Sequence, residues 1–139
     1  PNDFENLIHS NINRGGYYLT HVAFSLERMK ENGCSFAPEK DRNIRQKVAE
    51  GMVKIINDPI TVADLRYEAV AFLFHMGRRD LVEASWIDQI VSEQENDGGW
   101  EVNREIRPKE GRDHPTLLAI WALLEYGRSN APNEPMIRH

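Results

Sequence analysis

The chain has a single cysteine, no long apolar run and no excess of basic residues, and each lack excludes a class of protein. Cys34 stands alone, so no disulfide can form within the chain. No apolar run is long enough to cross a bilayer, and no signal peptide is visible. We therefore expect a soluble protein without a membrane span. The compartment stays open, with the cytoplasm favoured.

The net charge is −5 and the basic residues are scattered rather than clustered. A protein that binds nucleic acid or an anionic membrane surface usually carries a basic patch, so we expect neither partner. The chain has 139 residues, of which 40% are hydrophobic and 28% charged. This is enough for one globular domain with a real core, and it argues against disorder.

Motifs that hold phosphates, dinucleotides or metal ions are also missing. The sequence contains no phosphate-binding loop, no dinucleotide fingerprint and no nucleophile elbow. No two histidines have the close spacing of a zinc-binding helix. We expect no cofactor and no metal ion.

What the sequence does contain is helical periodicity. The predicted helices span residues 3–13, 17–32, 39–57, 67–76, 80–95 and 117–126. The first, third and fifth have apolar residues on one face, which is typical of a helix with one neighbour. The fourth and sixth are apolar nearly all round, as buried helices are, and the second is intermediate. Exposed and buried helices therefore alternate along the chain.

Each even-numbered segment ends on a glycine: Gly33, Gly77 and Gly127. Glycine is the usual residue just past a helix end because it adopts the left-handed conformation at little cost. The spacings of 44 and 50 residues between these glycines indicate a weak repeat of one exposed and one buried helix. The fold class is therefore all-α, with about three stacked hairpins in a single domain over residues 1–128 and a frayed tail over 129–139.

One segment resembles a known repeat. Residues 86–100 read WIDQIVSEQENDGGW, which is similar to the glutamine–tryptophan repeat of the triterpene cyclases and related α/α-toroid proteins. The matching residues are Gln94, Asp97, Gly98, Gly99 and Trp100. The resemblance implies that Gln94 caps backbone groups and that Trp100 packs across the hairpin junction. It also implies half of a toroid or an open solenoid, because a full toroid has six hairpins.

The resemblance does not extend to chemistry. The acidic motif with which those cyclases protonate a polyene is absent, and the zinc ligands of the protein prenyltransferases have no convincing counterpart. Because α/α toroids serve both enzymes and binding domains, the resemblance points to a fold rather than to an activity.

Polar residues that could act together stand near the N-terminal ends of the even-numbered helices. The candidate pocket residues are His21, Asp64, Tyr67, Glu68, Trp100, Asp113 and His114. If the hairpins stack in parallel, these ends converge and their dipoles favour anionic ligands or carboxylates. The structural alternative is that Thr20, Asp64 and Asp113 simply cap their helices. Glu68 interrupts a buried face and needs a partner such as Arg66 or a histidine.

Two functions remain open at this point. The preferred one is a non-catalytic module for binding or assembly, which self-associates or docks on another domain through the ends of its hairpin array. The alternative is an enzyme of the toroid kind, a cyclase, transferase or lyase, with His21, Asp64, Glu68 and His114 as its acid–base residues.

Overall fold

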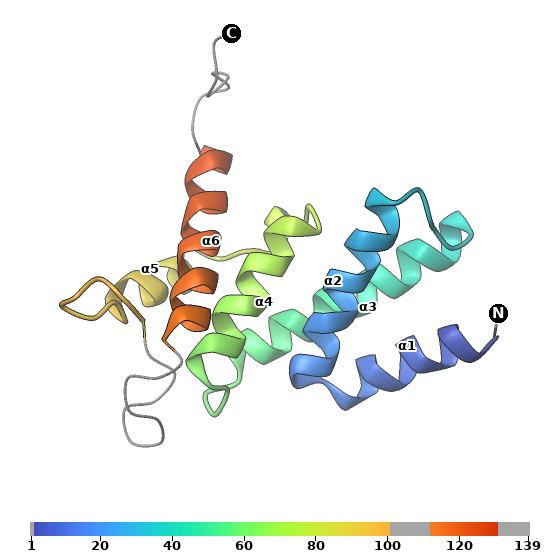
Figure 1. Ribbon diagram of the computed structural model, residues 1–139, viewed down its shortest axis with the longest axis horizontal. Helices are drawn as coiled ribbons and strands as arrows, with labels where there is room; N and C mark the ends of the chain where they lie inside the picture. Colours follow the sequence, from blue (N-terminus) through green and yellow to red (C-terminus); the bar gives the residue numbers. More distant parts are fainter. Residues whose placement is uncertain (1, 101–111, 131–139) are drawn as a thin grey trace, which may run out of the picture.

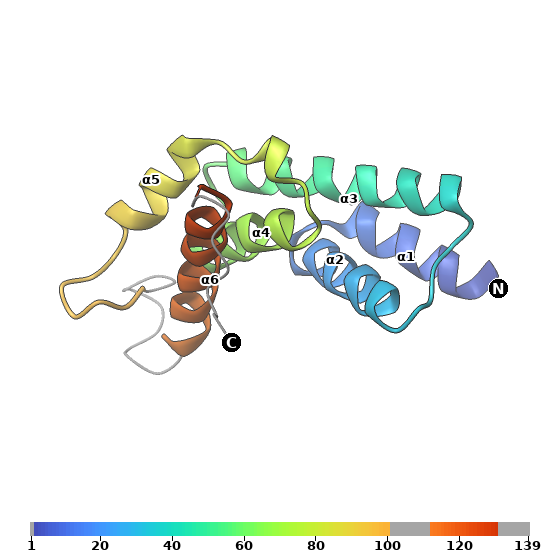
Figure 2. The same ribbon diagram turned by 90° about the horizontal axis from the view of Figure 1, so that it is seen from above.

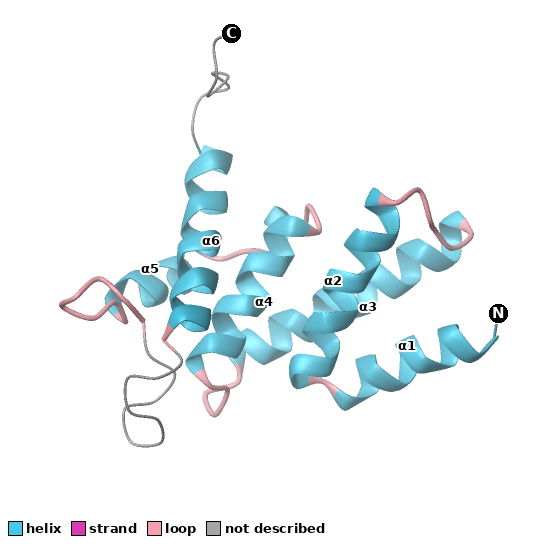
Figure 3. Cartoon of the chain, in the orientation of Figure 1, coloured by secondary structure: helices cyan, strands magenta, loops and turns pink. Residues whose placement is uncertain are grey.

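The computed structural model describes residues 2–100 and 112–130, and these residues form helices joined by short turns, with no strand among them (Figure 3). The α-helices are α1 (Asn2–Arg14), α2 (Gly16–Glu31), α3 (Pro38–Asn57), α4 (Ala63–His75), α5 (Ala84–Ser92) and α6 (Asp113–Asn130). A 3-10 turn, η1 (Arg79–Leu81), precedes α5. The predicted all-α fold with six helices is confirmed.

The helices form three stacked hairpins in two layers. Helices α2, α4 and α6 lie side by side in one layer and run in the same direction, so that their N-terminal ends share one edge (Figure 1). Helices α1, α3 and α5 form the second layer behind them (Figure 2). Helix α4 lies between α2 and α6 and also packs on α3. This arrangement brings the N-terminal ends of three helices together, which is the condition for a shared site.

The centre of the core is α4, which the sequence predicts to be buried on all sides. Ala69, Ala71 and Leu73 are fully buried, and Val70 is 1% exposed. The small alanine side chains of α4 lie in the same core as Ala119 and Ala122 of α6, which are also fully buried. Small residues let two helix backbones approach closely, and α4 makes its most extensive contact with α6.

Two of the three predicted glycine stops are confirmed. Gly33 and Gly77 have φ angles of 71° and 72°, and each ends its helix in a Schellman motif. After Gly77, for example, the Arg78 amide donates to the Leu73 carbonyl at 2.8 Å. The third prediction is wrong, because Gly127 lies inside α6, which continues to Asn130. The predicted 129–139 tail otherwise lies outside the described residues.

Helix α6 is less buried than its sequence predicts. Three of its apolar side chains are exposed: Leu117 at 63%, Leu124 at 61% and Ile120 at 42%. The reason is its position, because among the described residues α6 is the last helix of its layer and has a layer neighbour on one side only (Figure 1). The sequence of α6 is apolar on all sides, but the helix lies at the end of the array and is therefore only partly buried.

The fifth predicted helix, 80–95, is shorter in the structure, where α5 covers Ala84–Ser92. After the stop at Gly77 the chain forms η1, and Val82 and Glu83 are extended. This bend packs Leu81 and Val82 against the core before α5 begins at Ala84. The predicted 96–113 loop is described only in part, since residues 101–111 lie outside the described chain.

Candidate functional site

The site lies at the edge where α2, α4 and α6 begin. Glu68 of α4 is 3% exposed and stands between two histidines of the neighbouring helices. His21 Nε2 lies 4.0 Å from Glu68 Oε1, and His114 Nε2 lies 3.9 Å from Glu68 Oε2. These three residues were predicted as site candidates from separate segments, and His21 and His114 are 93 positions apart in the sequence (114 − 21). In the structure they lie in a row across the layer. We refer to His21, Glu68 and His114 as the histidine row.

A second carboxylate lies one turn earlier on α4. Asp64 is 7% exposed, and its Oδ2 accepts a hydrogen bond of 2.6 Å from the Tyr17 hydroxyl of α2. Asp64 and Glu68 are four residues apart, so both project from the same face of the helix. The predicted candidates His21, Asp64, Glu68 and His114 are thus brought together, with Tyr17 as a member that the sequence analysis missed.

The electrostatics of this edge are set by burial. Burial raises the pKa of Glu68, and the nearby Asp64 carboxylate adds to the rise. The nearby Thr20 hydroxyl and the charges of His21 and His114 oppose it. Desolvation is the largest of these effects, because a charged carboxylate loses its hydration when it is buried. Burial therefore disfavours the charged form of Glu68 relative to that of an exposed glutamate.

One to two helical turns beyond the histidine row, the same three helices present aromatic side chains. The ring centroids of Phe24 and Phe72 are 6.1 Å apart, and those of Phe72 and Trp121 are 5.5 Å apart with edge-to-face geometry. Phe72 is buried, whereas Phe24 is 42% exposed and Trp121 is half-buried. We refer to Phe24, Phe72 and Trp121 as the aromatic row. The layer therefore carries a polar row and an apolar row side by side.

Two predicted pocket residues lie apart from these rows. The Tyr67 hydroxyl donates a hydrogen bond of 2.6 Å to Glu93 Oε2, beyond α5, and so points into the space between the layers. Arg66 pairs with the same Glu93 carboxylate at 2.6 Å and is not the partner of Glu68. Asp113 is exposed at the first residue of α6. Tyr67 and Arg66 tie α4 to the segment that follows α5, which is a structural role.

The capping interpretation of Thr20 and Asp64 is wrong. Helix α2 begins at Gly16, because Gly15 and Gly16 adopt φ angles of 68° and 54° and turn the chain sharply out of α1. Thr20 therefore lies inside the helix, where its hydroxyl donates to the Tyr17 carbonyl at 3.0 Å. Asp64 lies in the first turn of α4, whose N-cap is Val62, and its side chain is bound by Tyr17. Neither side chain caps its helix.

The segment that resembles the glutamine–tryptophan repeat forms a tight turn after α5. Gln94 Nε2 donates to the Gly98 carbonyl at 2.9 Å, and Asp97 Oδ1 accepts from the Gly99 amide at 3.2 Å. Arg112 pairs with Asp97 at 2.6 Å, and this pairing holds the pKa of Asp97 well below its usual range. These contacts give Gln94, Asp97, Gly98 and Gly99 a structural role.

Trp100 has the same structural character, although it was also a candidate for the pocket. Its side chain is 2% exposed, and its indole N–H donates to the Ile90 carbonyl at 2.7 Å. Its backbone amide donates to Thr116 Oγ1 at 3.0 Å, which joins the turn to the first turn of α6. Trp100 therefore fixes the last hairpin from within and does not line the histidine row.

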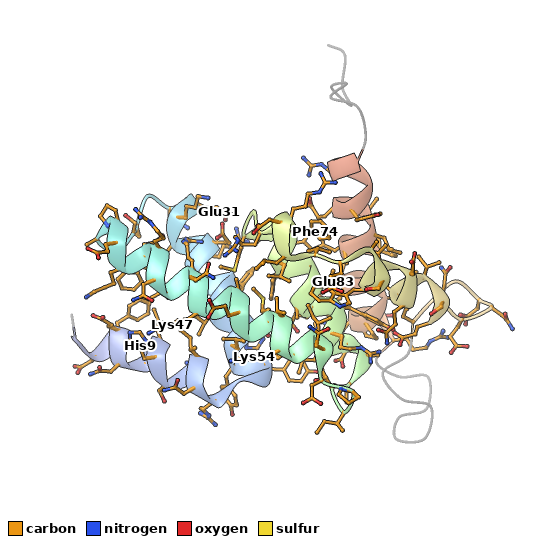
Figure 4. All side chains as sticks on the ribbon, turned by 180° about the vertical axis from the view of Figure 1, so that it is seen from behind. His9, Glu31, Lys47, Lys54, Phe74 and Glu83 are labelled. Atoms are coloured by element: carbon orange, nitrogen blue, oxygen red, sulfur yellow. The ribbon has the colours of Figure 1, made fainter. Side chains whose placement is uncertain are left out.

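The sequence analysis missed a groove between α1 and α3. This groove has a volume of about 800 Å³, and Lys47 and Lys54 of α3 lie along it (Figure 4). The available sequence signal was Gly51, between the two lysines. A Cβ atom at Gly51 would lie 2.6 Å from Leu19 Cδ2, so glycine permits the close approach of α2 and α3 on the floor of the groove. Glu50 and Asp58 also line the groove, so its charge is mixed.

The chemistry available to the described residues is acid–base and ionic. Among residues 2–100 and 112–130, no three His, Cys, Asp or Glu side chains are placed to hold a metal ion. None of the helices described is long and apolar enough to cross a membrane.

Comparisons of the chain with protein-family models, with curated proteins and with solved structures find no match. The relation to the α/α toroids therefore stays a prediction that rests on the sequence.

Proposed function

We propose that this domain is an assembly module in which the hairpin array of one copy continues into that of a second copy. The observation that carries the proposal is the uncovered apolar stripe of α6, formed by Leu117, Ile120 and Leu124. Spacings of three and four residues place these side chains on one face of the helix. The corresponding helix α4 has layer neighbours on both sides and buries its apolar residues, so in the described part of the chain α6 lacks one neighbour.

The opposite end of the array offers a surface of the same kind. On α1 and α2, Phe4 is 46% exposed, Leu7 56% and Tyr18 48%. These side chains surround a hollow of about 170 Å³ between α1 and α2. A stripe at one end and an apolar hollow at the other favour head-to-tail packing, with the Leu117 and Leu124 side chains of one copy against α1 and α2 of the next.

Head-to-tail packing also accounts for the number of hairpins. A full α/α toroid has six hairpins, and two copies with three hairpins each supply that number. The segment ending at Trp100 resembles one repeat of such a toroid. If the rotation between copies closes, a dimeric ring forms, and if it does not, a longer solenoid forms. This supports self-association as the function, with the ring as its closed form.

The enzyme alternative has one observation in its favour, the buried Glu68 between two histidines. General acid–base groups need to lie within hydrogen-bond reach of each other or of a shared reacting atom. The two His–Glu distances of 4.0 and 3.9 Å are longer than that, and Thr20 and Asp64 already have partners on α2. The geometry therefore supports assembly better than catalysis.

Light scattering coupled to size-exclusion chromatography tests the proposal. We expect the wild type to elute as a dimer or larger species, and Leu117→Glu and Leu7→Glu each to shift it towards monomer. Ile60→Glu is the matched control, because Ile60 is 87% exposed on the α3–α4 loop, away from both ends. A mixture of Leu117→Glu and Leu7→Glu retains one intact junction and should form a dimer. A strictly monomeric wild type at high concentration would overturn the proposal.

A further inference from the structure

The edge where α2, α4 and α6 begin contains two buried carboxylate oxygens without hydrogen-bond partners. Within the described residues, Asp64 Oδ1 and Glu68 Oε2 are buried and accept no hydrogen bond. Both side chains are more than nine-tenths buried, with exposures of 7% and 3%. Buried carboxylate oxygens are normally satisfied, and the cost of leaving one unpaired is on the order of 1–3 kcal/mol. Two such oxygens on adjacent turns of one helix indicate a place for a donor that the protein itself does not supply.

The charge of this edge favours a positively charged donor. Neither Asp64 nor Glu68 forms an ion pair with a lysine or arginine among the described residues, and the flanking basic groups are His21 and His114 alone. When the imidazoles are neutral, the edge is acidic. The sequence predicts that these helix ends favour anionic ligands or carboxylates, and two carboxylates of the chain itself, Asp64 and Glu68, lie in the first two turns of α4.

A ligand can reach the Glu68 carboxylate by displacing the two imidazole rings that cover it. The side chains of His21 and His114 are 72% and 58% exposed, whereas that of Glu68 below them is 4% exposed. Exposed side chains change rotamer readily, so the two rings can swing apart without unfolding a helix. Their neutral nitrogens can also accept hydrogen bonds from an incoming N–H group. A donor with several N–H groups would thus meet carboxylate and imidazole acceptors together.

The aromatic row indicates that a ligand bound at Glu68 would also have an apolar part. Phe24, Phe72 and Trp121 lie on the same three helices, further along from the histidine row. Their rings provide apolar contact area, and ring faces also attract a nearby cation. A molecule with a charged head on Glu68 would lay its apolar part across these rings.

We propose that α2, α4 and α6 together bind a small amphiphilic primary amine in its ammonium form. Its ammonium group donates to the free oxygens of Asp64 and Glu68 between His21 and His114, and its hydrocarbon part packs on the aromatic row. A primary ammonium fits better than a quaternary one, because the unpartnered oxygens need N–H donors. The site does not include the exposed stripe on α6 and goes beyond the assembly function, although His21 also lines the hollow between α1 and α2.

The probe that tests the site is n-hexylammonium, titrated into the full chain and followed by amide chemical shifts in nitrogen–proton NMR spectra. We expect saturable shifts centred on α2, α4 and α6 near Glu68. Two compounds with the same hydrocarbon chain serve as controls: 1-hexanol lacks the charge, and hexanoate reverses it. Hexanol should bind at least about tenfold more weakly, since each tenfold change corresponds to about 1.4 kcal/mol, and hexanoate should not bind at this site.

The decisive variant is Glu68→Gln, which keeps the shape of the side chain and removes its charge. The variant should fold, because it removes a buried charge rather than a packing contact. We expect it to weaken hexylammonium binding by about tenfold or more. Glu83→Gln, an exposed change just before α5, should bind as the wild type does. Equal binding by hexanol and hexylammonium, unchanged binding by Glu68→Gln, or shifts confined to the α1–α3 groove would each overturn the proposal.

Discussion

The hydroxyl of Tyr17 donates a hydrogen bond of 2.6 Å to Asp64 Oδ2, and this bond joins the first turn of α2 to the first turn of α4. The two residues are 47 positions apart in the sequence. Because the other Asp64 oxygen has no hydrogen-bond partner, Tyr17 is the group that compensates for the burial of this carboxylate. The alignment of two helix ends thus depends on one phenol and one carboxylate.

We expect Tyr17→Phe to destabilise the fold by about 1–3 kcal/mol, because it leaves the buried Asp64 carboxylate without its donor. The measurement is the free energy of unfolding from urea denaturation at neutral pH. Tyr18→Phe is the matched control: Tyr18 is the next residue, is 48% exposed and stacks its ring beneath the Arg14 guanidinium. The control should change the stability by less than about 0.5 kcal/mol. Equal effects of the two variants would contradict the role assigned to Tyr17.

The pH dependence of stability should report on Glu68. Because burial raises the pKa of Glu68, the folded chain binds more protons than the unfolded chain between the ordinary value of 4.5 and the raised value. The stability that this group contributes is therefore present at low pH and is lost as the pH rises through that window.

The comparison of the wild type with Glu68→Gln isolates this effect. Glutamine does not titrate, so the stability of the wild type relative to the variant should decrease as the pH rises from 4.5. Thermal unfolding at a series of pH values gives the difference directly. Glu83→Gln, which is exposed, should instead remain parallel to the wild type across the series. A wild type that gains stability over Glu68→Gln with rising pH would show that the Glu68 carboxylate is stabilised rather than penalised by its surroundings.

Trp100 should be among the most costly side chains to remove. It is 2% exposed, donates to the Ile90 carbonyl and holds the turn against Thr116. We expect Trp100→Ala to cost about 3–5 kcal/mol, through the cavity and the unpaired Ile90 carbonyl. Val91→Ala, at a 53% exposed position on the neighbouring turn of α5, should cost less than about 0.5 kcal/mol. Guanidinium denaturation followed by circular dichroism measures both, and a small loss for Trp100→Ala would remove the structural role of the turn.

Periodicity was sufficient to predict the all-α fold, because the helices of this chain differ in how many faces they bury. The pattern around Phe72 predicts a helix with neighbours on both sides, and the structure buries it. The equally apolar pattern around Ile120 predicts the same, but α6 ends the layer and leaves that side chain 42% exposed. A sequence shows which faces are apolar, whereas the number of neighbours depends on the position of a helix in the array.

The candidate site was predictable in part for a related reason. Parallel stacking of the hairpins places the N-terminal ends of α2, α4 and α6 side by side, and this brings His21 and His114 to Glu68. The direction of Tyr67 could not be predicted, because it depends on the rotation of α4 about its axis, which turns this side chain towards Glu93. The role of Tyr17 could not be predicted either, because it depends on the side chain reaching Asp64, which lies 47 positions further along the chain.

The two glycines after α4 and within α6 look equivalent in the sequence but should respond to substitution in opposite ways. Gly77 has a φ angle of 72°, so Gly77→Ala forces an alanine into the left-handed region and should cost about 1–2 kcal/mol. Gly127 lies within α6, and an added Cβ there would meet nothing within 4 Å. Alanine is favoured over glycine inside a helix, so Gly127→Ala should stabilise the fold by up to about 1 kcal/mol. Thermal melts of the two variants beside the wild type should shift in opposite directions. A loss of stability in Gly127→Ala similar to that in Gly77→Ala would mean that α6 ends at this glycine, as its sequence predicts.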